Sequence, residues 1–194
     1  MAVLECARML GRRRFLVGLG GVGLFLGVPA RGHATTVRPV SLAELVQASR
    51  HVLVGVPVES YSQWEKLADA RRIVTYSRIV TRDELDGSKP ESELLVRTLG
   101  GRVGDVAQLV HGEARLRQGE PHALFLYKNR DGALTVTAMA QGEFPVVRDE
   151  RGVERLERSR ALGHMKVVAR SAVLALDGRD LATARNLIRE ATQK

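Results

Sequence analysis

Cysteine is almost absent from this sequence. The chain of 194 residues holds a single cysteine, Cys6, which lies within the first 34 residues. Residues 35–194 therefore cannot form an internal disulfide, and they offer no thiolate as a nucleophile or metal ligand. Such a segment tolerates an oxidising compartment without mispairing of thiols.

A strong charge of one sign is also missing from most of the chain. The formal net charge is +8, but five of the 30 basic residues lie in the first 34 residues beside one acid. Residues 35–194 carry 25 basic and 21 acidic side chains, a net charge of +4. This balance gives no reason to expect a nucleic acid partner. With 44% hydrophobic and 27% charged residues, the composition is that of a folded globular protein.

Signatures of known catalytic sites are absent too. The sequence has no G-x-S-x-G, no P-loop lysine and no H-E-x-x-H. A G-x-G-x-x-G match at residues 18–23 lies between an arginine cluster and a small-residue site, not between a strand and a helix. We therefore expect no cofactor and favour a non-enzymatic role. The alternative is a metal-dependent hydrolase or other enzyme with a site near His111, Glu113 and His122, which could meet across a hairpin. Surface positions beside a glycine turn explain these residues equally well, and we assign no metal site.

No hydrophobic run is long enough to span a bilayer comfortably. The longest, from Phe15 to Val28, has about 14 residues. It follows Arg12-Arg13-Arg14 and precedes a small-x-small site at Gly32-His33-Ala34. These three parts are typical of an export signal. We expect residues 1–34 to be cleaved and the protein to be periplasmic or secreted; a short retained anchor is the alternative.

The arginines and the residues after them, Arg12-Arg13-Arg14-Phe15-Leu16, resemble the twin-arginine signal pattern. The apolar run that follows is rich in glycine and only moderately hydrophobic, as in that class. Because Gly11 replaces the usual polar residue before the pair, a general secretory signal is the alternative.

Strand patterns dominate the middle of the chain and helix patterns the ends. The expected strands are 51–61, 71–84, 93–99, 106–110, 114–117, 122–128, 134–140 and 144–148. The capping box Ser41-Leu42-Ala43-Glu44 predicts a helix that ends near Ser49, and Asp180 is positioned to cap a terminal helix. Residues 149–160 carry both charges densely and predict a solvated loop or frayed helix.

These elements predict a mainly β protein with terminal helices, a small OB-like antiparallel β-barrel or sandwich. We expect one domain over residues 35–194, with a β core at about 51–148 and a helical segment at about 162–193. Pro57 has no N–H for a strand ladder, so its strand should lie at an edge or carry a bulge there. The strand His122–Lys128 is apolar on both parities and should be covered on both faces, with Phe125 in the core.

A glycine-rich segment with arginines is the candidate binding loop. Its residues are Arg97, Gly100, Gly101, Arg102, Gly104, Asp105 and Arg115. Glycine lets a partner's backbone approach closely, although it also supplies positive φ at barrel corners. The arginines could contact an acidic surface or a glycan, or form a solvated strand face. We expect the partner to be a protein or glycan of the cell envelope, besides the export machinery.

Residues Ser41 to Arg148 resemble a family of uncharacterised bacterial exported proteins. The matching stretches are Ser41-Leu42-Ala43-Glu44-Leu45, Arg72-Ile73-Val74-Thr75-Tyr76, Val96-Arg97-Thr98-Leu99-Gly100-Gly101, Gly112-Glu113-Ala114-Arg115, Gly119-Glu120 and Leu124-Phe125-Leu126. The resemblance implies an OB-type barrel, somewhat similar to the inhibitory domain of tissue metalloproteinase inhibitors. Those inhibitors chelate zinc through an N-terminal cysteine, which residues 35–194 lack. The resemblance therefore implies a fold and a compartment, and no function.

Overall fold

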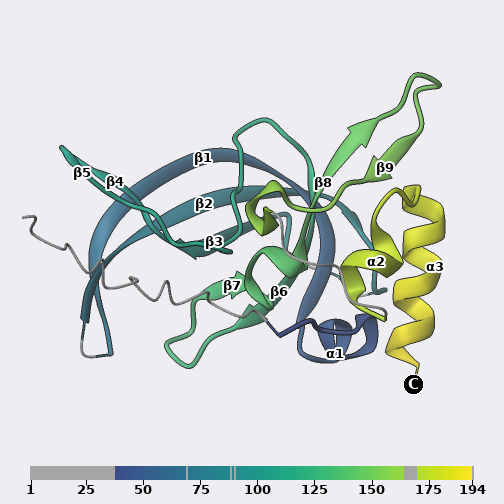
Figure 1. Ribbon diagram of the computed structural model, residues 1–194, viewed down its shortest axis with the longest axis horizontal. Helices are drawn as coiled ribbons and strands as arrows, with labels where there is room; N and C mark the ends of the chain where they lie inside the picture. Colours follow the sequence, from purple (N-terminus) through teal and green to yellow (C-terminus); the bar gives the residue numbers. More distant parts are fainter. Residues whose placement is uncertain (1–37, 69, 88, 90, 164–169, 194) are drawn as a thin grey trace, which may run out of the picture. The chain divides into compact units, whose positions relative to one another are not determined.

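A seven-stranded sheet forms the centre of the computed structural model, which describes residues 38–68, 70–87, 89, 91–163 and 170–193 (Figure 1). The expected export signal and residues 164–169 lie outside the described residues. The strands of the sheet are β1 (His51–Leu67), β2 (Ala70–Glu84), β3 (Glu93–Leu99), β6 (His122–Lys128), β7 (Leu134–Val136), β8 (Glu143–Arg148) and β9 (Glu154–Leu156). Their order is β1-β2-β3-β7-β6-β8-β9. A separate hairpin contains β4 (Gly101–Val103) and β5 (Val106–Gln108).

Five of these strands close into a ring. β1 pairs with β2 along its length and also with β6 through His51–Gly55, so the ring runs β1-β2-β3-β7-β6 and back to β1. Every pairing in the ring is antiparallel except β3 with β7, which is parallel. The prediction of a mainly β fold with a barrel-like centre is confirmed.

Irregular pairing bends the long strands β1 and β2. Val58 has no partner between the pairs Pro57–Ile79 and Glu59–Arg78, so β1 bulges beside Pro57 as the missing N–H predicts. β1 also runs six residues further than the predicted end at Tyr61, to Leu67. The bulge shifts the alternation of side chains by one residue. Leu53 faces the ring interior before it, and the even-numbered Ser60 and Ser62 face the same way after it.

The strand β6 is buried on both faces, as predicted. Leu124 and Leu126 belong to a cluster inside the ring, together with Leu53, Ile79 and Val96. On the opposite face, Ala123 and Phe125 belong to a second cluster with the helices. Phe125 is fully buried, and its ring meets that of Phe144 edge to face at 6.1 Å between centroids.

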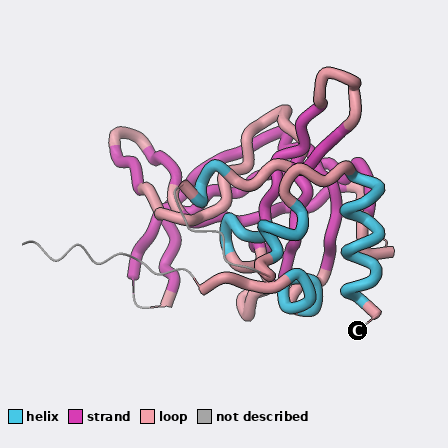
Figure 2. The backbone as a smooth tube through the Cα atoms, turned by 45° about the vertical axis from the view of Figure 1, so that its right-hand side comes forward, coloured by secondary structure: helices cyan, strands magenta, loops and turns pink. Residues whose placement is uncertain are grey.

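Three short helices cover this second face of β6 and β1 (Figure 2). They are α1 (Leu42–Gln47), α2 (Ala172–Leu176) and α3 (Leu181–Thr192). Ser41 and Glu44 form the predicted capping box of α1, and the Asp180 carboxylate caps α3 by accepting the N–H of Thr183 at 2.9 Å. Among the described residues, no helix has the length and apolar character needed to cross a membrane.

Several predicted strands are shorter than expected or absent. Residues 114–117 form no strand, because Ala114 and Leu116 pack into the ring interior from a loop. The strand predicted at 134–140 ends at Val136, where left-handed Ala138 and Met139 lead into a 3-10 helix (η1, Met139–Gly142). Residues 149–160 form a hairpin turn followed by β9 and the start of a second 3-10 helix (η2, Arg160–Leu162).

Candidate functional site

A line of side chains crosses the outer face of the ring. The strand registers pair Tyr61 with Tyr76, Tyr76 with Arg97, Arg97 with Thr135, and Thr135 with Tyr127. Residues directly opposite each other on neighbouring strands point to the same face. Because Val96 faces the interior, Arg97 and the row that includes it face outward. We call these five residues the tyrosine row.

Arg97 is the charged centre of the tyrosine row. Its side chain is 6% exposed, and its guanidinium forms ion pairs with Glu65 Oε2 at 3.3 Å and with Asp131 Oδ2 at 2.7 Å. Tyr76 donates its hydroxyl hydrogen to Glu65 Oε1 at 2.7 Å. The N–H of Ala133 and the Arg97 guanidinium lower the pKa of Asp131, so this carboxylate stays charged near neutral pH. The positive charge of Arg97 is therefore compensated within the site.

Arg97 lines a cleft of about 590 Å³, which we call the Arg97 cleft. One wall is the end of the β1–β2 hairpin, with Lys66, Leu67 and Ala68, and the other is the β6–β7 turn, Asn129–Asp131. Tyr127 and Thr135 of the tyrosine row also line it. The lining thus combines apolar and aromatic surface with a larger number of polar and charged side chains.

The backbone around the Arg97 cleft is strained. Ala68 and Met139, which line it, have φ values of 49° and 57°, and Ala138 beside Met139 has 55°. Such values are uncommon for residues other than glycine and cost on the order of 1–3 kcal/mol each. In addition, Thr135 Oγ1 is buried and has no hydrogen-bond partner among the described residues. Backbone strain and unsatisfied polar atoms lower stability, and proteins tolerate them mainly at sites that serve a function such as binding.

Glu113 connects the Arg97 cleft to a second hollow of about 290 Å³ at the mouth of the ring. Thr98, Leu99 and Glu113 line both spaces. Glu113 is 7% exposed, and burial raises its pKa to about 7, although the N–H groups of Ala114 and Leu99 act in the opposite direction. This carboxyl group therefore exchanges a proton near neutrality, where it can either donate or accept a hydrogen bond.

The predicted binding-loop residues lie in two places. Arg97 lines the Arg97 cleft, whereas Gly100, Gly101 and Arg115 line the second hollow. Arg102, Gly104 and Asp105 lie on the β4–β5 hairpin, outside the lining of both spaces in the described part of the chain.

A close approach within the chain explains why residue 101 is glycine. Its φ is +131°, and a Cβ there would lie 2.3 Å from Thr75 Oγ1 and 2.4 Å from Ser62 Oγ. The close approach is therefore between β4 and the β1–β2 hairpin of this chain itself.

The sequence patterns do not single out four residues of this region: Tyr61, Tyr127, Asp131 and Thr135. One signal could have found two of them. Hairpin pairing of the strands that flank the turn at Asn129 places Tyr127 opposite Thr135.

The structure does not assemble His111, Glu113 and His122 into one site. His111 is exposed, while His122 is 1% exposed and meets Glu143 through Nδ1 and Oε1 at 2.8 Å. The other ring nitrogen of His122 accepts the N–H of Arg117 at 3.3 Å. Within the described ranges, no three His, Cys, Asp or Glu side chains form a group that could hold a metal ion.

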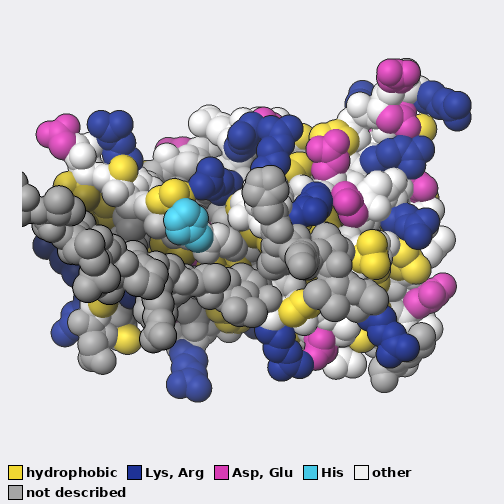
Figure 3. All heavy atoms as spheres, viewed as in Figure 1, with side chains coloured by type: hydrophobic (Ala, Val, Ile, Leu, Met, Phe, Trp, Pro, Cys, Tyr) yellow, Lys and Arg dark blue, Asp and Glu magenta, His cyan; other side chains and the backbone are white. Residues whose placement is uncertain are grey.

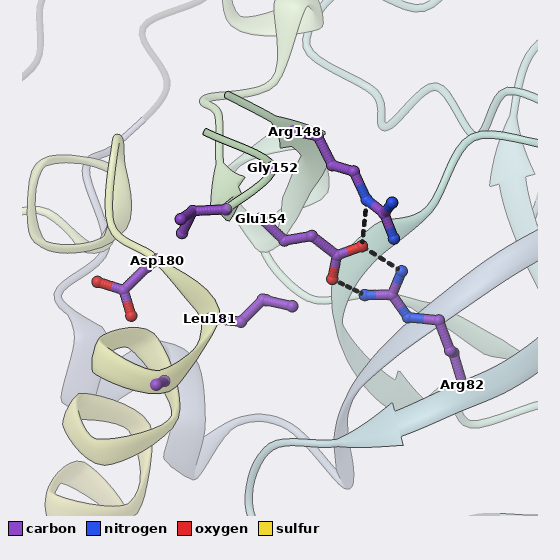
Figure 4. A pocket seen from close by; sticks show the side chains of 8 residues that line it. Arg82, Arg148, Gly152, Glu154, Asp180 and Leu181 are labelled. Carbon is purple, nitrogen blue, oxygen red and sulfur yellow. Dashed lines mark hydrogen bonds and ion pairs between the residues drawn. The ribbon is translucent and has the colours of Figure 1, made fainter. Parts of the chain in front are cut away.

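A further hollow of about 550 Å³ lies between the β8–β9 hairpin and the start of α3 (Figure 4). Glu154 points between Arg82 and Arg148, accepting two hydrogen bonds from Arg82 at 3.0 and 2.8 Å and one from Arg148 at 3.4 Å. On the face in Figure 3, Lys and Arg side chains are spread over several elements, and acidic groups lie among those near β8 and β9. In this hollow the Glu154 carboxylate is thus paired with two arginines.

Comparisons with known proteins add no relative: no family model matches the chain, and no curated protein or solved structure shows significant similarity to it.

Proposed function

We propose that this protein is an exported, non-enzymatic binding module of the bacterial cell envelope, and that the Arg97 cleft is its binding site. Its ligand is a protein or a glycan of the envelope. Export is supported by the basic, apolar and small-residue parts of residues 1–34. The scarcity of cysteine is compatible with an oxidising compartment.

The barrel is OB-like in this proposal. Numbered along the chain, the ring strands follow the order 1-2-3-5-4 and close back onto strand 1, with a parallel contact between the third and fifth. This order supports a likeness to the five-stranded Greek-key barrel of OB-folds, which bind ligands on the face of strands 2 and 3 and with the loops joining strands 1–2 and 4–5.

The observation that carries the proposal is the position of the Arg97 cleft. Its walls are the β1–β2 hairpin and the β6–β7 turn, which are the 1–2 and 4–5 connections of the ring, and Arg97 belongs to its third strand. Compensated charge, strained backbone and the buried Thr135 hydroxyl all occur at this same place. Geometry and local chemistry therefore favour one site.

Site-specific photo-crosslinking in cells tests this proposal. A photoreactive residue replaces Lys66, which is exposed and lines the cleft, and in a matched variant it replaces Arg151, which is exposed in the turn between β8 and β9. We expect envelope adducts at position 66 and none at position 151. Equal labelling at both positions, or no adduct at position 66, would contradict the cleft as the binding site.

A further inference from the structure

We infer that the Arg97 cleft binds a neutral glycan chain, which would extend along the tyrosine row. The inference rests on the proposed binding function and names the chemical class of its ligand. It is carried by three features of the row: its aromatic surface, its planar polar groups and its internal charge balance.

Aromatic surface lies at both ends of the tyrosine row. Tyr61 is 49% exposed and stacks on Tyr76, with 5.5 Å between centroids and 21° between ring planes. Tyr127 lines the cleft at the other end. The C–H face of a pyranose ring is apolar, so it packs against a flat aromatic ring, while the ring's hydroxyl groups remain free for polar contacts.

Between the tyrosines lie planar polar groups that suit neighbouring hydroxyls. The Asp131 carboxylate and the Asn129 amide line the cleft, and each has two polar atoms in one plane; the Arg97 guanidinium beside them is held by Glu65 and Asp131. Paired donors or acceptors of this kind bind two adjacent ligand oxygens at once. Thr98 and Thr135 contribute hydroxyl groups to the same cleft.

The charges of the cleft favour an uncharged ligand. The three cations Arg97, Lys66 and Arg130 are offset by Glu65, Asp131 and the partly ionised Glu113, so the cleft is close to neutral. A polyanion such as single-stranded nucleic acid needs a positively charged groove that tracks its backbone. An uncharged polyol needs no net charge in its site.

The test is titration calorimetry of the full-length protein with four neutral tetrasaccharides, the β-1,4-linked glucose and N-acetylglucosamine chains and the α-linked glucose and mannose chains. A dT oligomer, a sulfated heparin oligomer and an extended neutral peptide are the comparison probes. We expect at least one neutral tetrasaccharide to bind, with a Kd that changes little between about 50 and 500 mM salt.

Three variants locate the binding. Tyr61→Ala should weaken it at least about fivefold, whereas Tyr61→Phe, which keeps the ring, should stay within about twofold of wild type. Trp64→Ala is the matched control, because Trp64 is another exposed aromatic residue of β1 but pairs with Ile73 and points to the opposite face from Tyr61. Equal weakening by Trp64→Ala would overturn the inference.

Two other results would also overturn the inference. One is no binding of any neutral tetrasaccharide up to about 10 mM. The other is binding confined to the charged probes or the peptide. In either case, protein adducts at position 66 would leave the proposed binding function standing, so the two failures are distinguishable. Absence of both adducts and glycan binding would contradict the glycan inference and the proposed binding function together.

Discussion

Burial distinguishes the side chains that hold this fold from those at its surface. Phe125 is fully buried and belongs to the cluster formed by β1, β6 and the helices. Arg102 is exposed on the β4–β5 hairpin. The two residues therefore form a natural pair for a measurement of stability.

Phe125→Ala should be strongly destabilising. Removal of a buried phenylalanine ring costs about 3–5 kcal/mol through lost transfer energy and the cavity that remains. Domain stabilities are only about 5–15 kcal/mol, so the melting temperature should fall by many degrees. Arg102→Ala should change stability by no more than about 0.5 kcal/mol. Thermal melts of both variants provide the measurement, and a Phe125→Ala variant as stable as wild type would contradict the assigned core.

Two threonines near the cleft should respond in opposite ways to removal of the hydroxyl group. Thr135 Oγ1 is buried without a hydrogen-bond partner in the described chain, whereas Thr137 Oγ1 lies 2.8 Å from Ser49 Oγ. Thr135→Val should therefore be neutral or stabilising by about 1 kcal/mol, and Thr137→Val should cost about 1 kcal/mol. Urea unfolding distinguishes them; a clear loss of stability in Thr135→Val would show that its hydroxyl is satisfied in solution.

Glu113 should make stability depend on pH. Its pKa is about 7 in the folded protein and near 4.5 when unfolded, so the folded state binds the proton more tightly. The stabilisation is fully present below pH 4.5 and is lost as the pH rises through about 7. It amounts to roughly 3 kcal/mol.

Unfolding of wild type and of Glu113→Gln between pH 4.5 and 8 measures this contribution. The variant keeps the shape of the side chain without its titration, so its stability should fall less steeply as the pH rises. Parallel curves for the two proteins would show that Glu113 does not titrate in this range.

The glycines of the β4–β5 hairpin determine how that element sits against the β1–β2 hairpin. Gly101→Ala would place a methyl group within 2.3 Å of Thr75 Oγ1, so either β4 or the Thr75 and Ser62 side chains must shift. Gly104, with φ +57°, has open space around it, and Gly104→Ala should cost only about 1 kcal/mol of backbone strain.

We expect Gly101→Ala to cost more than Gly104→Ala and to increase amide exchange within β4 and β5. Hydrogen exchange followed by mass spectrometry provides this measurement. Equal protection of the hairpin in both variants would contradict the close approach.

At the scale of elements, local patterns predicted the regular strands and the helix starts. β3 and β6 match the predicted ranges, and the caps at Ser41 and Asp180 are present, because alternation and capping depend on neighbours in sequence. The extension of β1 to Leu67 was missed because its residues pair with β2 while having little apolar alternation of their own. The opposite error occurs at residues 114–117, where a strand is predicted and none is present. Ala114 and Leu116 pack against the ring interior but have no strand partners.

For the molecule as a whole, the site was harder to predict than the fold. The sequence neighbourhood of Arg97 suggests it as a candidate, but its proximity to Asp131 and Tyr127 depends on registers between strands far apart in the chain. Whether two residues face each other across a sheet is decided by bulges such as that at Val58, and a shift of one residue changes the face.

Export remains a prediction for the whole chain. Residues 1–34 fused to a reporter should carry it out of the cytoplasm. Replacing Arg12, Arg13 and Arg14 with lysine keeps the charge but removes the guanidinium groups, so it should block a twin-arginine route. Fractionation of cells that express the fusion and its triple variant measures this. Unchanged export of the variant would indicate the general secretory route.

Closure of the ring through β1 and β6 has a consequence for the order of events during synthesis. The ring can close only after Leu126, the strand partner of His51, has been synthesised. The cluster around Phe125 also includes Ile188 and Ala191 of α3. Contacts between such distant segments form slowly, because a long loop must close before they are made. The cluster on the second face of β6 cannot be completed on the ribosome while α3 is still inside the exit tunnel.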